Sequence, residues 1–380
     1  MKTRMTELFG IEYPIMCGGM FTLAVPKLCA AICEAGALGN LTAAMYPTPD
    51  DLRNAIREVR KLTQKPFCVN ITMLPAMRIS DEHYENWFRV VAEEHVAGIE
   101  IGGKPLDKLG NGQWIKILHD AGVKLMHKVG AVKHGKHAEE AGYDAVIAAG
   151  VEEGGHPLNE NVTSMVLTQK MAETLGIPVI STGGCCTGRA LAASLCLGGE
   201  GIMFASRFIC TPECDVHDNV RQELIRRQEN ETVLYGNAIG LQGRALLNDT
   251  MREVLKIEAE PGGTMEEKLM KVLPLIAGTH GPTIWREGNL NIGSINVGQS
   301  IGLIHQVMPV KEMIQEIVRE AEKQVAKASR ALLPSLPPAT RKISWEKPRA
   351  SAGRKRKPKA KTKPKAKAKT KAKPSRRKRK

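Results

Sequence analysis

Eight short apolar runs, rich in valine and isoleucine, recur through the first 208 residues and constrain the fold more than any other feature of the sequence. Amphipathic stretches separate them, which is the pattern of successive strand–helix units around a parallel sheet. The runs cover residues 14–20, 37–42, 66–72, 96–102, 124–129, 143–150, 177–184 and 201–208. Eight such units predict a closed (β/α)8 TIM barrel of the α/β class.

An open, doubly wound sheet is the alternative fold for this pattern. It would require a glycine-rich turn with G-x-G-x-x-G spacing directly after the first strand. The first run ends instead in residues 17–20 (CGGM), which lack this spacing. The barrel is therefore the better interpretation.

The periodicity becomes mainly helical after the eighth run. We expect the barrel to cover residues 1–214, a small inserted helical subdomain to cover 215–289, and a return segment with a C-terminal helix to cover 290–333. Residues 334–380 begin with a linker containing several prolines, which end a helix and favour extended chain, and continue as a lysine-rich tail.

Positive charge is concentrated in this tail. The chain has a net charge of +15, but residues 349–380 contain 18 lysines and arginines and no acidic residue, so the remainder carries about −3. Lysine alternating with alanine, proline and threonine cannot form an apolar core, and the tail is predicted to be disordered. Such a polycation binds nucleic acid or another polyanion without sequence specificity; the alternative is a terminal extension that only improves solubility.

Cysteine usage and hydropathy indicate the compartment. The nine cysteines are an odd number, none has zinc-site spacing, and we predict no metal. Unpaired thiols in a long chain without an apolar leader are typical of a reducing cytoplasm. No run approaches the roughly 20 apolar residues of a membrane span.

Small residues end the last two predicted strands. Gly183 and Gly184 close the seventh run, and residues 203–206 (MFAS) lie in the eighth. In a barrel, free backbone N–H groups after these two strands form the usual phosphate-binding site, so we predict a phosphorylated ligand. The alternative is that the two glycines merely make a tight turn.

His156 ends the segment 152–156 (EEGGH), which follows the sixth run at the predicted mouth of the barrel. A histidine there can act as a general acid or base, or donate a hydrogen bond to a developing anion. The alternative is an ordinary histidine of a surface loop. The adjacent Glu152 and Glu153 are weaker candidates, since paired acidic residues in loops are usually solvated.

Three further polar residues lie where a ligand is expected. Asn70 ends the third run and Lys128 the fifth, and Gln299 lies in the apolar return segment. Each side chain needs a polar partner, which is either the ligand or a neighbouring loop.

Several segments together resemble the nitronate monooxygenase family, also called 2-nitropropane dioxygenase-like. They are residues 3–11 (TRMTELFGI), 13–15 (YPI), 34–39 (EAGALG), 66–70 (PFCVN), 152–156 (EEGGH) and 177–180 (IPVI) with Gly183 and Gly184. The resemblance runs over about residues 3 to 333.

This resemblance implies a noncovalently bound FMN, a catalytic role for His156, and oxidation of alkyl nitronates by dioxygen to carbonyl compounds and nitrite. The flavin carries the redox chemistry in such enzymes. The residues that we expect to bind FMN are Gly18, Gly19, Met20, Asn70, Lys128, Ala149, Gly154, Gly183, Gly184, Met203, Phe204, Ala205, Ser206 and Gln299. Ala149 stands where many members have glutamine.

Two other functions stay open. An NAD(P)H-dependent flavin oxidoreductase, such as an enoyl-acyl carrier protein reductase or a quinone reductase, shares the barrel, the FMN loops and the Gly-Gly-His element. The other alternative is not an enzyme function: the chain is a polyanion-binding protein with a vestigial barrel. A homodimer and a small-molecule substrate are expected for either enzyme, and no membrane association is expected for any of them.

Overall fold

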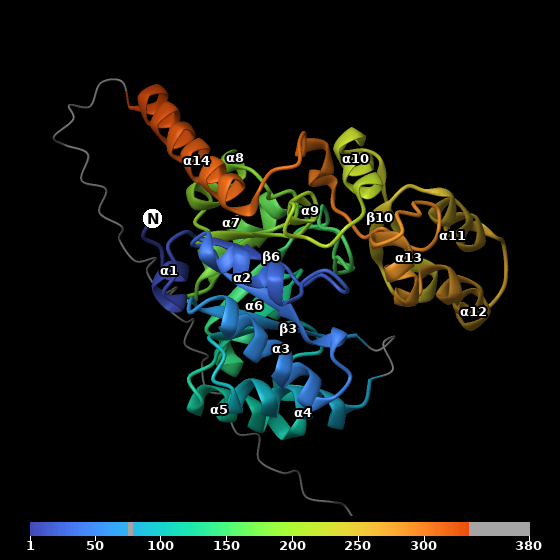
Figure 1. Ribbon diagram of the computed structural model, residues 1–380, viewed down its shortest axis with the longest axis horizontal. Coiled ribbons are helices and arrows are strands. Elements are labelled where there is room, and N and C mark those ends of the chain that lie inside the picture. Colours follow the sequence, from blue (N-terminus) through green and yellow to red (C-terminus); the bar gives the residue numbers. More distant parts are fainter. Residues whose placement is uncertain (75–78, 334–380) are drawn as a thin grey trace, which may run out of the picture. The chain divides into compact units, whose positions relative to one another are not determined.

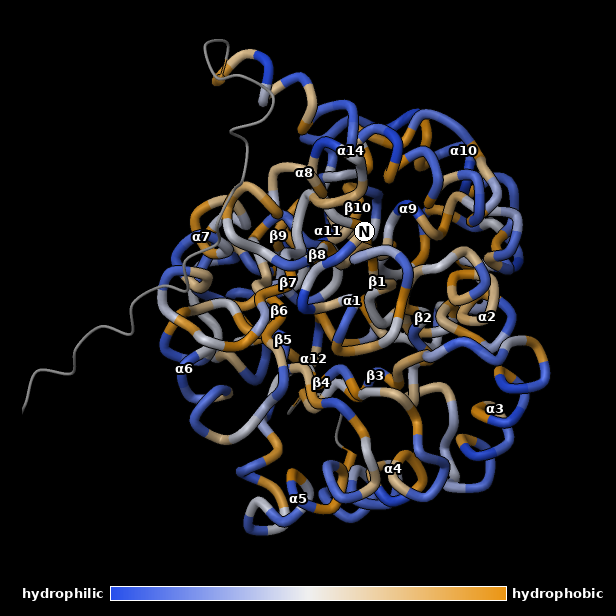
Figure 2. The backbone as a smooth tube through the Cα atoms, turned by 90° about the vertical axis from the view of Figure 1, so that its left-hand side faces the viewer, coloured by the Kyte–Doolittle hydropathy of each residue, from blue (hydrophilic) through white to orange (hydrophobic). Residues whose placement is uncertain are grey.

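Eight parallel strands form the centre of the computed structural model, which describes residues 1–74 and 79–333. They are β1 (Ile15–Cys17), β2 (Gly39–Thr42), β3 (Phe67–Met73), β4 (Gly98–Gly103), β5 (Lys124–Val129), β6 (Ala145–Ala149), β7 (Val179–Thr182) and β8 (Gly201–Phe204). Their order is β1-β8-β7-β6-β5-β4-β3-β2, and a parallel bridge between Met16 and Leu38 joins β1 to the start of β2. The strands follow one another around a ring in Figure 2. The predicted barrel is confirmed.

Helices alternate with the strands, as parallel pairing requires. They are α2 (Pro26–Glu34), α3 (Pro49–Leu62), α4 (Asp81–Glu93), α5 (Gln113–Asp120), α6 (Val132–Ala141), α7 (Ser164–Thr174), α8 (Gly188–Cys196) and the short α9 (Ser206–Ile209). Local sequence explains their starts. In α3, for example, Thr48 and Asp51 form a capping box and Pro49 occupies the first turn, where its missing N–H costs nothing.

A short N-terminal helix, α1 (Arg4–Phe9), closes one end of the barrel. A capping box between Thr3 and Thr6 begins the helix, and Gly10 ends it in the left-handed conformation. Its buried Met5 and Phe9 pack in one cluster with inward-facing strand residues, among them Met126. Burial of two such side chains contributes roughly 1.5–3 kcal/mol each. A ligand can therefore enter the barrel only from the opposite end.

A further group of helices and strands, here called the inserted unit, follows the eighth strand. It contains α10 (Asp218–Arg226), β9 (Thr232–Tyr235), β10 (Gly243–Leu246), α11 (Asp249–Ala259), α12 (Met265–Ile276), the 3-10 helix η6 (Gly278–His280) and α13 (Gly281–Trp285). Figure 1 shows β10 and α11–α13 gathered together. Strands β9 and β10 are antiparallel, and Tyr235, Ala245 and Val272 belong to their own apolar cluster.

The chain then returns to the barrel. The 3-10 helix η7 (Gln299–Leu303) is followed by α14 (Val310–Leu332), whose apolar face packs on α8. The two helices approach so closely that a Cβ on Gly188 would lie 2.3 Å from the Ile317 carbonyl oxygen. Within residues 1–74 and 79–333, no helix has both the length and the apolar composition of a membrane span.

Two predicted features differ from the structure. The eighth strand ends at Phe204 and not at residue 208, because the backbone leaves the extended region at Ala205 and α9 begins at Ser206. The inserted region contains the β9–β10 hairpin besides helices, since residues 232–246 pair with each other rather than follow a helical period. The predicted linker and basic tail, residues 334–380, lie outside the described residues.

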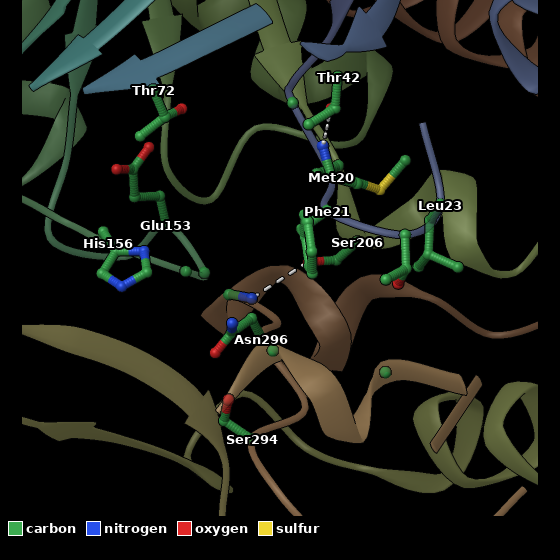
Figure 3. A pocket seen from close by; sticks show the side chains of 18 of the residues that line it. Met20, Phe21, Leu23, Thr42, Thr72, Glu153, His156, Ser206, Ser294 and Asn296 are labelled. Atoms are coloured by element: carbon green, nitrogen blue, oxygen red, sulfur yellow. Dashed lines mark hydrogen bonds between the residues drawn. The ribbon is translucent and has the colours of Figure 1, made fainter. Parts of the chain in front are cut away.

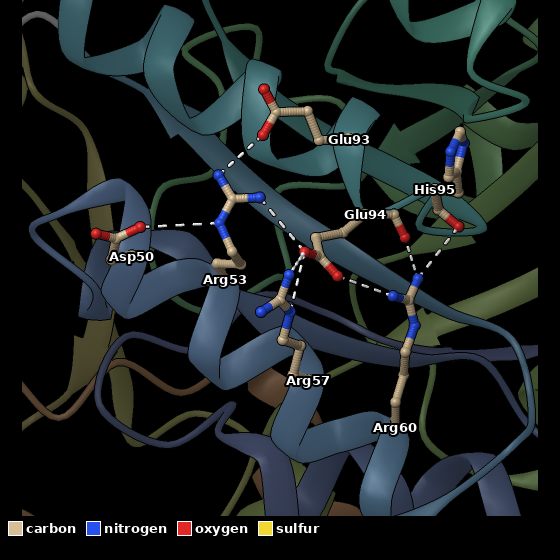
Figure 4. Close-up of polar contacts among 7 residues, drawn as sticks. All are labelled: Asp50, Arg53, Arg57, Arg60, Glu93, Glu94 and His95. Carbon is tan, nitrogen blue, oxygen red and sulfur yellow. Dashed lines mark hydrogen bonds and ion pairs between the residues drawn. The ribbon is translucent and has the colours of Figure 1, made fainter.

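A network of three arginines on α3 holds the carboxylate of Glu94, the residue that ends α4 (Figure 4). Nη2 of Arg57 and Nη1 of Arg60 each lie 2.9 Å from it, and Nη1 of Arg53 lies 3.3 Å away. Burial by itself would raise the pKa of Glu94, but hydrogen bonds from Arg57 and Arg53 outweigh this effect and lower the pKa. The network fastens two neighbouring barrel helices to each other.

We expect Glu94→Gln to lower the free energy of unfolding at pH 7 by about 2–3 kcal/mol, because hydrogen bonds to a charged, mostly buried group are lost. A depressed folded pKa stabilises the fold above the unfolded value of about 4.3 and stops doing so as the pH falls through the folded value. Urea denaturation from pH 7 to pH 3 should therefore show the difference at neutral pH and its disappearance in acid. The more exposed Glu93→Gln is the control, with an expected loss under about 1 kcal/mol.

Candidate active site

A cavity of about 830 Å³ lies at the carboxyl ends of the barrel strands and continues toward the inserted unit. Polar residues of strands β2 to β5, among them Thr42, Thr72 and Lys128, line one part of it. Apolar residues of α12 and α13 line another part. Figure 3 shows its labelled side chains, with His156, Ser206 and Asn296 around the same space. Ligand sites of barrels lie at this rim, so the cavity is the candidate active site.

The loops after β7 and β8 leave backbone N–H groups free at the cavity wall. Gly183 and Gly184 have φ angles of +94° and +71°, which glycine adopts easily. Among the described residues, no acceptor is within hydrogen-bonding geometry of the N–H groups of Gly183, Gly184, Ala205 or Ser206. The Ser206 hydroxyl accepts a hydrogen bond from the Gly298 N–H at 3.1 Å, and its own hydrogen remains available. These donors, called the phosphate cradle below, fit a phosphate group.

Two further glycines are required by close packing around the cavity. A Cβ on Gly19 would lie 2.3 Å from Cγ of Asn70, so the backbone after β1 rests directly on that amide. A Cβ on Gly154 would lie 2.3 Å from the carbonyl carbon of Val297. Side chains at these positions would push the loops apart. The space that a flat ligand needs between the loops would then be lost.

The loop that carries His156 is fastened at three places. The Glu152 carboxylate accepts hydrogen bonds from the N–H and hydroxyl of Ser164 at 3.0 Å. The Glu153 carboxylate lies 3.0 Å from Nζ of Lys128 on β5. The backbones of Gly155 and Arg244 exchange hydrogen bonds of 3.0 and 2.7 Å, which join the loop to β10. The loop therefore presents His156 at a defined place.

His156 lines the cavity, and its ring makes no hydrogen bond to any residue of the described ranges. Burial, together with the positive charge of Lys128, lowers its pKa to about 4. The imidazole is therefore neutral at pH 7 and still carries one N–H. A neutral imidazole donates a hydrogen bond to an oxygen well, but with this pKa it is a weak general base.

A buried group of charges surrounds Lys128. Burial disfavours its ammonium form, but Glu153 and Glu100 outweigh this effect and raise the pKa of Lys128. Burial raises the pKa of both carboxyls, against the opposing effect of Lys128. Glu100 also accepts hydrogen bonds from Asn40 and from the N–H of Gly19. Lys128 thus places a compensated positive charge at the cavity wall.

The inserted unit supplies an apolar wall. Met270, Leu273 and Ile276 of α12 and Trp285 of α13 line the cavity, and Phe21 after β1 approaches Gly278. Met270 is 64 % exposed and Phe21 is 47 % exposed. Large apolar side chains that stay exposed beside a cavity are typical of a site for an apolar ligand.

Most residues predicted from the sequence meet in this cavity. His156 lines it, as do Gly19, Met20, Asn70, Lys128, Gly154, Gly183, Gly184, Met203, Phe204, Ala205 and Ser206. Gly18, Ala149 and Gln299 lie beside it without lining it. Gly18 donates its N–H to Phe204, Ala149 ends β6 with its side chain buried, and Gln299 donates its N–H to Glu152.

Sequence reasoning missed several lining residues. Glu100 is one, although an acidic residue inside an apolar strand could have been noticed as a buried charge. The others come from the inserted unit and the return segment. They are Tyr235, Leu241, Met270, Leu273, Ser294 and Asn296, and no sequence pattern connects them to the barrel strands that line the same cavity.

A closed (β/α)8 barrel with free N–H groups after the last two strands and a histidine at the same rim is typical of barrel enzymes, whose active sites lie at this rim. The model of the nitronate monooxygenase family matches residues 2–320. The chain therefore belongs to this family, and it is a flavin-dependent oxidoreductase.

Three relatives are informative. A (3aS,4S,5R,7aS)-5-hydroxy-7a-methyl-1-oxo-octahydro-1H-indene-4-carboxyl-CoA dehydrogenase of Rhodococcus jostii is 30% identical over 86% of this chain and 97% of its own. A probable nitronate monooxygenase of Staphylococcus aureus is 29% identical over 68% of this chain and 82% of its own. The structure of FabK from Thermotoga maritima is 34% identical and covers 87% of this chain and 100% of its own, with a TM-score of 0.78.

We expect Glu153→Gln to lower the free energy of unfolding by about 3 kcal/mol, since it leaves Lys128 buried without its nearest counter-charge. The double variant Glu153→Gln with Lys128→Met should recover part of this loss, because the unpaired ammonium is removed, while Glu100 then loses its counter-charge. Urea denaturation measures both. Equal losses in the single and double variants would contradict the importance of this ion pair, and the more exposed Glu160→Gln serves as control.

Proposed function

We propose that the flavin of this oxidoreductase is FMN. The free N–H groups after β7 and β8 and the hydroxyl of Ser206 would hold its phosphate. Asn70, Gly19 and Lys128 would border its ring at the barrel rim, where they line the same cavity. A single phosphate fits this cradle, because its donors come from two adjacent short loops.

Ser206→Ala should weaken FMN binding about tenfold, since one hydrogen bond to a charged phosphate is lost. Titration of the apoprotein, followed by quenching of FMN fluorescence, measures the effect. Ser181→Ala is a matched control on the neighbouring strand, because its hydroxyl bonds Thr168 and Ser194 away from the cavity. An unchanged FMN affinity in Ser206→Ala would place the phosphate elsewhere.

We further propose that the enzyme reduces an α,β-unsaturated acyl thioester with an apolar acyl group, using electrons from NAD(P)H. The observation that carries this proposal is the apolar wall of α12 and α13, which extends the cavity beyond the residues assigned to FMN. A small nitronate bound at the flavin would not need an apolar surface of this extent. The carboxyl-CoA dehydrogenase of Rhodococcus jostii, which aligns over nearly its full length, is named for a CoA thioester whose acyl group is an octahydroindene ring system.

His156 and the apolar wall have different roles in this reaction. A flavin held here and reduced by NAD(P)H would supply the hydride chemistry at the β-carbon, and a proton from solvent would complete the reduction at the α-carbon. His156, neutral and held by its loop, donates a hydrogen bond to the thioester carbonyl oxygen, where negative charge develops. Met270, Leu273 and Trp285 hold the acyl chain and exclude water.

We expect NADPH or NADH to bleach the flavin absorbance anaerobically, and a medium-chain enoyl-CoA to restore it. His156→Ala should lower the rate of this second step about a hundredfold while FMN stays bound. Because the pKa of His156 is about 4, protonation of this residue should not affect the rate between pH 5.5 and 8. A rate that follows a histidine titration near pH 6.5, or full activity in His156→Ala, would overturn this role.

Nitronate monooxygenase activity is the second candidate. A nitronate is already deprotonated, so a histidine with a pKa of about 4 suffices to bind its oxygen atoms. The same anaerobic measurement of flavin absorbance distinguishes the reductase from the monooxygenase. Bleaching by propyl-2-nitronate and not by NADPH or NADH would favour the monooxygenase.

We also propose that residues 349–380 bind polyanions, because they carry 18 basic and no acidic residues. A variant ending at Leu333 should keep its FMN affinity and lose binding to a short DNA duplex. Fluorescence anisotropy at two salt concentrations measures this, and the full chain should bind more weakly at the higher one. DNA binding that survives truncation would mean that the tail is not responsible. The free cradle for FMN argues against a vestigial barrel.

A further inference from the structure

Asn296 is a polar side chain that faces the cavity without a role in the functions proposed so far. It lies in the return segment between the inserted unit and η7. The segment alternates, since Ile295 and Val297 are fully buried while Ser294 and Asn296 line the cavity. This period of two places successive side chains on opposite sides of an extended chain.

The backbone of this segment is held in position at both ends. The carbonyl of Ile295 accepts a hydrogen bond of 2.9 Å from Leu246 of β10. Beyond Asn296, Gly298 donates to the Ser206 hydroxyl at 3.1 Å and Gln299 donates to the Glu152 carbonyl at 2.9 Å. Asn296 therefore lies on an extended segment that is hydrogen-bonded to the His156 loop and to the phosphate cradle.

The amide of Asn296 is oriented by Tyr235. The Tyr235 hydroxyl donates a hydrogen bond of 3.3 Å to Oδ1 of Asn296. The tyrosine is 2 % exposed and its ring packs directly on Gly243, where a Cβ would lie 2.4 Å from its Cζ. Burial raises the pKa of Tyr235 to about 12, so its hydroxyl remains a donor at neutral pH. With Oδ1 occupied, the NH2 group of Asn296 is available to a ligand in the cavity.

We propose that Asn296 is a substrate-binding residue whose NH2 group and the ring N–H of His156 bind the polar end of the substrate together, and that Tyr235 is the positioning residue for Asn296. His156 and Asn296 come from opposite parts of the chain and face the same space (Figure 3). Two neutral donors suit an oxygen that carries partial or full negative charge, such as a thioester carbonyl. In naming the thioester, this inference rests on the proposed function.

The test uses the FMN-loaded enzyme and decanoyl-CoA, a saturated thioester that can bind but cannot be reduced at a double bond. Its binding is followed by the change in flavin absorbance. Asn296→Ala should raise the dissociation constant about tenfold, the effect of one lost hydrogen bond, and should raise KM for the enoyl-CoA similarly. Asn296→Asp, which puts a carboxylate beside the substrate oxygen, should weaken binding more. Asn291→Ala is the matched control, since Asn291 is an exposed asparagine of the same segment that does not line the cavity, and it should change the constant less than about twofold.

Tyr235→Phe distinguishes positioning from general structural support. It should weaken binding about threefold in the wild-type background and have no further effect in Asn296→Ala, because its role passes through that amide. Independent losses that multiply in the double variant would overturn the role of Tyr235. Wild-type binding by Asn296→Ala would overturn the whole inference.

A parallel arm with propyl-2-nitronate separates this inference from the proposed function. If the wild-type enzyme does not reduce enoyl-CoA but is reduced by the nitronate, the thioester proposal fails. The inference then survives if Asn296→Ala still raises the nitronate concentration for half-maximal flavin reduction about tenfold, and fails if that concentration is unchanged. A wild-type flavin that responds to neither ligand counts against both.

Discussion

The closure of eight parallel strands into one ring is the constraint on which the rest of this structure depends. Parallel strands direct all their carboxyl ends to the same rim, and the bridge between Met16 and Leu38 completes the circle. The other rim is filled by Met5 and Phe9 of α1. Loops that are far apart in sequence therefore converge on one side only. The candidate site is formed there because that rim alone brings together free N–H groups, buried charges and a histidine.

Rigidity at this rim comes from polar contacts that surround the ligand space without filling it. The His156 loop is bound to α7 through Glu152, to β5 through Glu153, and to β10 through Gly155. Gly19 and Gly154 let neighbouring backbones approach where any side chain would collide. Such a shell holds catalytic groups at fixed distances, which is what stabilisation of a developing charge requires.

The inserted unit lines the part of the cavity that lies beyond the barrel strands. It adds the apolar wall around Met270 and Trp285, and the return segment adds Asn296 with its partner Tyr235. The barrel and its cradle suit any flavin enzyme of this class. Relatives that share the family are named for different reactions, and in the proposed function these later elements, not the barrel, contact the substrate.

The sequence by itself determined the elements and their class. Apolar runs gave the eight strands, and the amphipathic stretches between them gave the helices that alternate with the strands. Local chemistry also marked the loops with Gly183, Gly184 and His156, because glycine turns and a lone histidine after a strand are visible without a fold.

Only the tertiary structure decided which side chains share the cavity. The ion pair of Lys128 with Glu153, the carboxylate of Glu100 between strands, and the meeting of Asn296 with His156 join residues from separate elements. Their environments follow from burial, which one sequence without its fold does not reveal. The low pKa of His156 is of this kind, because it arises from the burial of the imidazole and from the charge of a lysine on another strand.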